Sequence, residues 1–145
     1  FRIGDHIKLA SGEVEIHSVN TGVPHAVLFV DDADKAMVSE LGHEIRHHNH
    51  YAPAGTNVNF VQRTGDDSIR VRTYERGVGE TLACGTGVSA AALMMAKLHG
   101  CGSPVRVRVL GGDDLGVAFE PAGDSFANVQ LTGPAEFVFS GQIEI

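Results

Sequence analysis

The stretch "TGVSAAALMMAKLH", residues 86–99, constrains the fold more than any other part of the sequence. It has helical character, yet apolar side chains occupy almost its whole circumference, and Lys97 is its only charged residue apart from the terminal histidine. A helix without a polar face must be buried on every side. The rest of the chain therefore has to form a shell around this helix, and the nature of the shell decides the fold class.

Segments with the alternating pattern of β-strands stand on both sides of this helix in the sequence. They are residues 13–18, residues 26–30, a hairpin at 57–74 with its turn at 64–67, a hairpin at 104–120 with its turn at 111–114, and a last pair at 127–131 and 136–140. A second helix is predicted at residues 34–48 from helical apolar spacing, with acids placed before it as start signals.

Strands are the only material available to bury the helix at 86–99. We therefore predict an α+β fold, in which a curved, mainly antiparallel sheet wraps around one central apolar helix. A chain of 145 residues with 43% hydrophobic residues can bury one core without disulfides or a structural metal. We assign residues 1–136 to a single domain and residues 137–145 to a terminal strand.

The net charge limits the kinds of binding partner, and the cysteine content indicates the cellular compartment. The net charge is −7 and the eleven Lys and Arg residues are scattered, so we expect no nucleic acid and no membrane as partner. Cys84 and Cys101 would lie about 25 Å apart at the two ends of one helix, too far for a disulfide. We interpret both as free thiols of a cytoplasmic protein, and Cys101 as structural.

Cys84 stands at the entrance of the apolar helix, which is an unusual place for an inert cysteine. The first turn of a helix presents unpaired N–H groups and the positive end of the dipole, which favour a thiolate and bind anions. Gly85, Thr86 and Gly87 allow a carboxylate or phosphate to approach the backbone. The simpler interpretation is a small residue at a helix start. Glu75, Arg76 and Glu80 cluster close by in the sequence, which suggests a loop that holds charged groups over the helix end and favours a functional thiol.

Other motifs suggest other chemistry. The segment "GVGETLACGTG" is glycine-rich but lacks the Gly-Lys-Ser/Thr of a nucleotide-phosphate loop. His25 is a candidate base for a cysteine hydrolase, although no protease signature surrounds it. The segment "HEIRH", residues 43–47, matches the zinc-protease pattern, but the helix soon reaches Pro53 and no third-ligand motif follows. We expect no metal site.

Four segments together resemble the C-terminal half of the diaminopimelate epimerase family, and the resemblance covers nearly the whole chain. They are "NTGVPHAVLFVDD" (20–32), "LGHEIRHHNHYAPAGTNVNFVQ" (41–62), "RTYERGVGETLACGTGVSAA" (72–91) and "VQLTGPAEFVFSGQIEI" (129–145). The third is highly specific. Members of this family interconvert the LL and meso forms of diaminopimelate without a cofactor. One cysteine thiolate removes the α-proton, and a second thiol returns a proton on the opposite face.

The resemblance assigns residues to the reacting centre. It implies that Cys84 is one of the two cysteines and that the backbone N–H groups of Gly85 and Thr86 hold the reacting carboxylate. It also implies that His25 and Glu75 tune the acidity of the two thiols. Without the resemblance, His25 would be interpreted as a hydrogen-bonded core histidine.

The resemblance also assigns residues to the remote end of the substrate. It implies that Glu75 and Arg76 bind the remote amino and carboxylate groups, with help from Asn57. Asn57 alone would be interpreted as a strand-end or turn residue. Many family members have Asn where this chain has Val23, so one amide contact to the remote carboxylate is absent. Asn20 or Thr21 replaces it, or the contact is lost.

The second cysteine of the family has no counterpart in this sequence. The partner lies in a homologous N-terminal half, and no second Cys-Gly-x-Gly segment occurs here. We therefore expect diaminopimelate and the missing N-terminal half as partners, consider a homodimer, and predict that this chain alone is inactive. Two alternatives remain open: another two-cysteine racemase, such as one for proline, and a non-catalytic anion-binding module.

Overall fold

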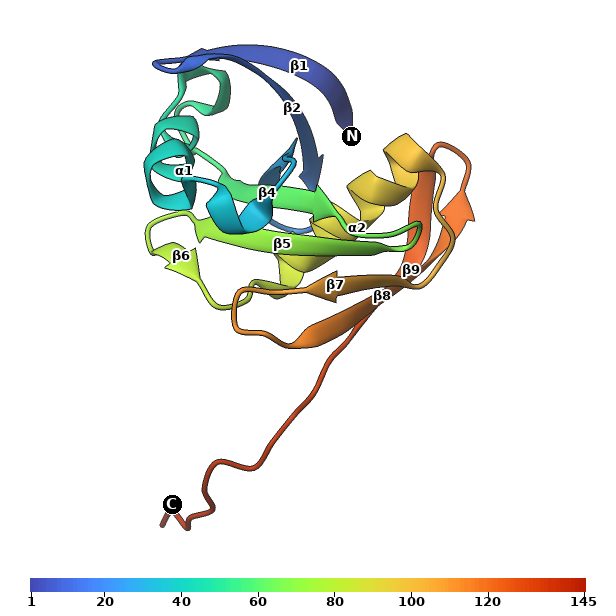
Figure 1. The fold of residues 1–145 in the computed structure, drawn as a ribbon. Helices are drawn as coiled ribbons and strands as arrows, with labels where there is room; N and C mark the ends of the chain where they lie inside the picture. The colour runs from blue at the N-terminus through green and yellow to red at the C-terminus, as the bar shows by residue number, and fades with distance from the viewer.

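Helix α2 (Gly85–His99) packs along the inner face of a curved sheet, in a computed structural model that describes residues 1–145 (Figure 1). Nine of its residues, all of them between Gly87 and Ala96, are buried. The helix ends at Gly100, whose φ of 65° is the left-handed conformation that favours glycine, and the Gly100 N–H donates to the Ala96 carbonyl. The predicted buried helix is confirmed, with one more residue at its N-terminus.

Nine strands form a single sheet around α2. They are β1 (Arg2–Leu9), β2 (Gly12–Asn20), β3 (Pro24–Phe29), β4 (Asn57–Arg63), β5 (Ser68–Glu75), β6 (Gly79–Thr81), β7 (Val105–Arg108), β8 (Asp114–Ala122) and β9 (Ser125–Thr132). Their order is β1-β2-β3-β4-β5-β7-β8-β9, and β6 pairs with β5. Only the pairs β3–β4 and β5–β7 are parallel, and their connections contain the two α-helices. The predicted α+β fold with a mainly antiparallel sheet is confirmed.

The two faces of the sheet carry separate hydrophobic clusters, because side chains alternate along each strand. One face packs on α2, and its cluster of 18 buried residues includes Val27 and Val61. The other face packs on helix α1 (Val38–Arg46), and its cluster includes Val58 and Phe60. Strand β4 is therefore buried on both faces over most of its length.

The helix predicted at residues 34–48 is not continuous, and only α1 within it is α-helical, so its predicted extent is wrong. A 3₁₀ turn, η1 (Ala33–Lys35), precedes α1, and a second 3₁₀ turn, η2 (Asn49–Tyr51), follows it. Ala36 has an extended backbone with a ψ of 134°, which ends η1 before α1 begins.

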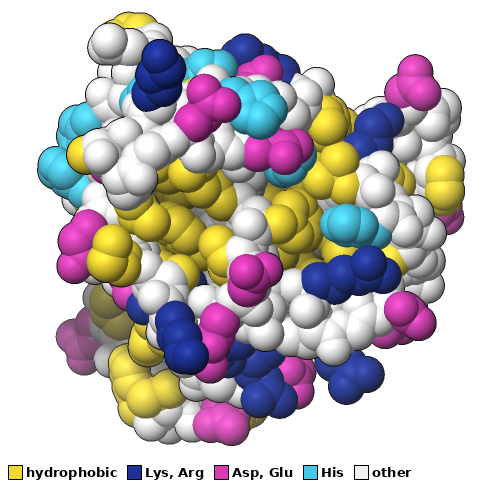
Figure 2. All heavy atoms as spheres, turned by 45° about the horizontal axis from the view of Figure 1, so that its top comes forward, with side chains coloured by type: hydrophobic (Ala, Val, Ile, Leu, Met, Phe, Trp, Pro, Cys, Tyr) yellow, Lys and Arg dark blue, Asp and Glu magenta, His cyan; other side chains and the backbone are white.

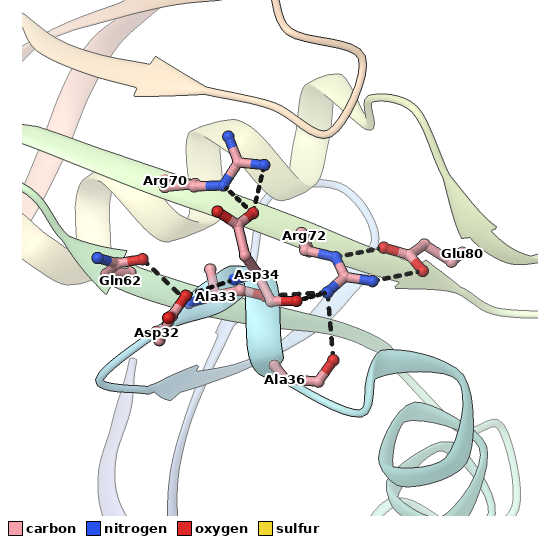
Figure 3. A network of polar contacts seen from close by, with 8 residues as sticks. All are labelled: Asp32, Ala33, Asp34, Ala36, Gln62, Arg70, Arg72 and Glu80. Carbon is pink, nitrogen blue, oxygen red and sulfur yellow. Dashed lines mark hydrogen bonds and ion pairs between the residues drawn. The ribbon is translucent and has the colours of Figure 1, made fainter.

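Arg72 on β5 explains this break (Figure 3). Its Nη1 donates to the carbonyls of Ala33, Asp34 and Ala36, at 2.9, 3.2 and 3.2 Å. These carbonyls would serve as acceptors within a continuous helix. A tertiary contact from a distant strand thus replaces the helical pattern that local spacing predicts.

The strand segments differ from the prediction mainly at the two ends of the chain. Both predicted hairpins are present, as β4–β5 and β7–β8. The sequence pattern does not predict β1, because its alternation is interrupted near Gly4 (φ 72°), where the register with β2 shifts. The predicted strand at residues 136–140 does not form within this chain. Residues 133–145 have no regular secondary structure and extend away from the sheet (Figure 1).

Figure 2 shows apolar side chains gathered in a hollow on the face where β1 and β2 arch over β4 and β5, with charged and histidine side chains around it. On the α1 face of the sheet, Val14, Leu28 and Phe60 help to line a groove of about 530 Å³.

No helix of the protein combines the length and the apolar character that are needed to cross a lipid bilayer.

Candidate functional site

The face of the sheet that packs on α2 carries polar side chains next to its apolar cluster. His25 on β3 lies beside Asn57 on β4, and Asn59 on β4 lies beside Thr73 on β5. Each of these four polar residues is two or four positions from an apolar residue of the same strand that packs on α2. Because side chains alternate along a strand, the four polar side chains also face α2. His25, Asn57, Asn59 and Thr73 are all buried. The sheet therefore presents a row of polar groups to the first turn of α2.

Cys84 is the N-cap residue of α2 and has an extended backbone, with φ −136° and ψ 109°. Its side chain is buried, and its Sγ lies 3.6 Å from the Thr86 hydroxyl oxygen. The N–H groups of the first helical turn have no carbonyl partner within the helix. The structure thus brings a thiol and a set of unpaired backbone donors together, as the sequence predicts for Cys84, Gly85 and Thr86.

Gly87 is required for this close packing. A Cβ at this position would lie 2.5 Å from Asn59 Oδ1 and 3.3 Å from both Cys84 Sγ and His25 Cε1. The first turn of α2 can therefore approach β3 and β4 only because residue 87 has no side chain.

His25 on β3 connects the sheet to the first turn of α2. Its Nε2 is 3.0 Å from Thr86 Oγ1, and its Nδ1 is 3.0 Å from Asn59 Nδ2. Burial lowers the pKa of His25 to about 4, against an opposing effect of the Glu75 carboxylate. His25 is therefore neutral at pH 7.

The residues predicted to bind the remote end of a substrate lie at the neighbouring edge. Glu75 ends β5, and Arg76 follows it in the turn of the β5–β6 hairpin. Asn57 Oδ1 accepts a hydrogen bond from the Arg76 backbone N–H at 2.6 Å, so Asn57 fixes the backbone of this turn. Arg76 is exposed, and its Nη1 donates to the Ala54 carbonyl at 3.2 Å. Asn57, Glu75 and Arg76 are thus brought together.

Glu80 does not join this group, which corrects the interpretation of the charged residues 75–80 as one cluster over the helix end. Arg72 holds its carboxylate through two hydrogen bonds, Nε to Oε1 at 2.6 Å and Nη2 to Oε2 at 2.9 Å (Figure 3). Strand alternation explains why Glu75 and Glu80 differ. Arg72 is three residues from Glu75, so the two side chains lie on opposite faces of β5, and Glu80 lies on the face of Arg72. Glu80 is a structural partner of Arg72.

The remaining candidate residues lie elsewhere. Cys101, a free thiol like Cys84, lies beyond the far end of α2, and burial raises its pKa. His43 and His47 have ring centroids 4.4 Å apart, and His47 Nδ1 lies 2.9 Å from the His43 carbonyl oxygen. No group of three or more His, Cys, Asp or Glu side chains is arranged to hold a metal ion.

A groove of about 530 Å³ runs beside the start of α2. Gly85 and Thr86 line one side, and Asn20 and Thr21 at the end of β2 line another. The Thr21 hydroxyl donates to the Thr86 carbonyl at 3.1 Å. The loop around Val23 is therefore tied to the first turn of α2.

Sequence reasoning missed Asn59 and Thr73. Both contact the predicted site, since Asn59 reaches His25 and the Thr73 hydroxyl donates to Asn59 Oδ1 at 2.8 Å. The available signal is the segment "NVNFV", in which a second asparagine interrupts an apolar strand two residues after Asn57. A buried amide in such a position must find hydrogen-bond partners.

Two solved structures share this fold. A hydroxyproline epimerase from Agrobacterium vitis, with bound trans-4-hydroxy-L-proline, matches with a TM-score of 0.71 and 21% identity, over 91% of this chain and 46% of that one. A probable proline racemase from Agrobacterium radiobacter matches with a TM-score of 0.68 and 19% identity, over 99% of this chain and 50% of that one. The chain therefore shares its fold with these two proteins.

The chain belongs to the diaminopimelate epimerase family. The family model described as diaminopimelate epimerase matches residues 17–138. The diaminopimelate epimerase of Chlorobaculum tepidum is 45% identical over 139 residues, which are 94% of this chain and 53% of that protein. That of Aquifex aeolicus is 47% identical over 128 residues, which are 86% of this chain and 44% of that protein. The chain thus spans about half the length of the curated relatives it matches.

Proposed function

We propose that this chain is one half of an amino-acid epimerase that interconverts LL- and meso-diaminopimelate through two cysteines. The observation that carries the proposal is the position of Cys84 at the N-cap of α2, beside unpaired N–H groups. Thr86 links this turn to His25, and His25 lies beside Asn57, which binds the Arg76 N–H. Membership of the family, whose relatives are diaminopimelate epimerases, supports the choice of substrate.

At the reacting centre, the thiolate of Cys84 removes the α-proton from one face of the substrate, or its thiol supplies the proton in the reverse direction. The N–H groups of Gly85 and Thr86 bind the α-carboxylate and stabilise the charge that develops when the proton leaves. His25 and Glu75 tune the reacting thiols. No pyridoxal or other cofactor takes part in this mechanism.

At the remote end, Arg76 pairs with the second carboxylate of the substrate and Glu75 pairs with the second ammonium group. Asn57 holds the turn that carries both through its bond to the Arg76 N–H. An epimerase for proline would have no remote charged groups to bind, so Glu75 and Arg76 favour diaminopimelate over proline or the hydroxyproline bound by one structural neighbour.

One thiol cannot serve both faces of the α-carbon, so the isolated chain is expected to be inactive. The second thiol comes from an N-terminal half of the kind that the relatives contain. Residues 137–145 pack on that half in this proposal, which gives their exposed apolar side chains a partner. The two free cysteines suit a cytoplasmic protein.

The experiment measures α-proton exchange of diaminopimelate in D2O, with this chain alone and with a separately made N-terminal half added. We expect exchange only when both halves are present. Exchange catalysed by this chain alone would contradict the two-half mechanism. No exchange with both halves, together with measured binding of diaminopimelate, would favour the alternative of a non-catalytic anion-binding module.

A further inference from the structure

The hydrogen bonds around Asn59 have a defined direction, because one end of its amide meets a backbone carbonyl. The Ala26 carbonyl can only accept, and it lies 3.0 Å from Asn59 Nδ2. The Thr73 hydroxyl donates to Asn59 Oδ1 at 2.8 Å. The Ala26 carbonyl therefore fixes the orientation of the amide, and the Thr73 hydroxyl completes it as the donor to Oδ1. The second Nδ2 hydrogen is directed at His25 Nδ1, 3.0 Å away.

This orientation determines the protonation of His25. A nitrogen that accepts a hydrogen bond from Asn59 carries no hydrogen, so the hydrogen of neutral His25 is on Nε2. The other tautomer would turn an Nδ1–H toward the Asn59 N–H, in a place where both side chains are fully shielded from water. His25 therefore donates from Nε2 to Thr86 Oγ1 at 3.0 Å.

The donor-to-acceptor direction of these hydrogen bonds continues from Thr86 to the Cys84 thiol. Because the Thr86 oxygen accepts from His25, its own hydrogen is free to point to Cys84 Sγ, 3.6 Å away. A hydroxyl that donates to sulfur stabilises a thiolate, whereas a hydroxyl that accepts from a thiol does not. Thr73, Asn59, His25, Thr86 and Cys84 form one chain of hydrogen bonds.

We propose that Asn59, held by Thr73, is a positioning residue of this site: it keeps His25 in the Nε2–H tautomer, so that the Thr86 hydroxyl donates to the Cys84 sulfur. The tautomer is a property of this chain alone. Only the consequence for proton transfer rests on the proposed function.

A direct test is the tautomer of His25, measured by two-bond ¹H–¹⁵N correlation spectra of the ¹⁵N-labelled chain. We expect a single Nε2–H form in the unchanged chain. Asn59→Asp replaces the donor by an acceptor and should add a proton at Nδ1. If the buried carboxylate of Asn59→Asp prevents folding, Asn59→Leu is the second variant, because a leucine is compatible with an apolar core. It removes the donor, and we expect a mixture of tautomers.

Two further variants and a control complete the test. Thr73→Val removes the bond to Asn59 Oδ1 and leaves the Ala26 carbonyl to orient the amide alone, so we expect a smaller Nδ1–H fraction than in Asn59→Leu. Thr73→Ser keeps the hydroxyl and should restore the single form. Asn49→Asp makes the same chemical change at an exposed position and should leave His25 unaffected. An Nδ1–H form in the unchanged chain, or an unaltered tautomer in folded Asn59→Asp or Asn59→Leu, would overturn the proposal.

The second readout is α-proton exchange in a protein that carries both halves. For Asn59→Leu we expect kcat to fall by about 10- to 100-fold, as is typical when a supporting hydrogen bond to a functional residue is lost, with KM little changed. An unchanged kcat in a variant whose tautomer has changed would overturn the positioning role. Absence of exchange in the unchanged protein, with the expected tautomer present, would instead count against the proposed function alone.

Discussion

At the scale of single residues, the chemistry of the site depends on one thiol and its neighbours. Cys84 and Cys101 are both free, but only Cys84 lies at the helix start, beside the polar row of the sheet. The two cysteines therefore form a natural pair for comparison. His25 is the other residue whose environment changes its chemistry, since it is buried and neutral.

We expect Cys84→Ala to lower kcat for α-proton exchange by at least about 100-fold in a protein that carries both halves, because the proton donor or acceptor of one face is lost. Cys101→Ala is the matched control and should retain nearly full activity. Circular dichroism should report a folded chain for both variants. Similar activity of the two variants would remove Cys84 from the mechanism.

The stability of the chain should depend on pH through His25. Burial lowers its pKa from the ordinary 6.5 to about 4 in the folded chain, so the unfolded chain binds more protons between these values. The contribution of neutral His25 is complete above pH 6.5 and is lost as the pH falls toward 4. The shift corresponds to about 3 kcal/mol in the free energy of unfolding.

Urea denaturation at several pH values checks this expectation. His25→Gln should reduce the loss of stability between pH 6.5 and 4, whereas His6→Gln, at an exposed histidine, should not. Some dependence should remain in the His25 variant, since burial also lowers the pKa of His17. Identical profiles for the unchanged chain and His25→Gln would contradict the assignment of a neutral, buried His25.

At the scale of secondary-structure elements, the β5–β6 hairpin is the part of the fold that carries Glu75 and Arg76. Its stem is fixed by Arg72, whose guanidinium binds Glu80 on β6 and the carbonyls at the end of η1 (Figure 3). The side chains of Arg72 and Glu80 are 15% and 18% exposed, so this pair is well shielded from solvent. One arginine thus connects three elements and supports the turn that carries Glu75 and Arg76.

Arg72→Lys should destabilise the chain by about 1.5 kcal/mol, because a lysine cannot reproduce the two parallel bonds to Glu80 together with the carbonyl contacts. In a protein with both halves, KM for diaminopimelate should rise as the turn loosens. Arg108→Lys is the matched control, since Arg108 makes a similar two-bond contact to Asp114 at the exposed surface. We expect a smaller change there, and urea denaturation compares the two. Equal effects would show that the hairpin does not depend on Arg72.

At the scale of the whole molecule, the chain folds around α2 but leaves apolar surface at its C-terminal end. Phe137 and Phe139 are almost fully exposed, and residues 133–145 extend away from the sheet. The same chain spans about half of its relatives. Both observations suit a protein whose fold is completed by a second half.

Removal of residues 137–145 should leave the free energy of unfolding of the isolated chain unchanged within about 0.5 kcal/mol, because these residues contribute no buried core. The same truncation should weaken association with an N-terminal half. Urea denaturation measures the first effect, and calorimetric titration of the two halves measures the second. The same affinity with and without the segment would show that it does not pack on the other half.

The sequence by itself determined the elements whose signals are local. The apolar circumference of α2 required burial, and the position of Cys84 before that helix identified the thiol, since both depend on neighbours along the chain. The hairpins β4–β5 and β7–β8 followed from alternation and turn residues. Family membership followed from four contiguous segments.

Only the tertiary structure decided which distant residues share the site. Strand register placed His25, Asn57, Asn59 and Thr73 on one face of the sheet. Glu80 lies on the other face, where it pairs with Arg72. The same arginine ended η1 where local spacing predicts a continuous helix. Register and side-chain contacts between strands depend on the whole sheet. No local pattern could therefore have shown that a buried amide on β4 controls the histidine beside Cys84.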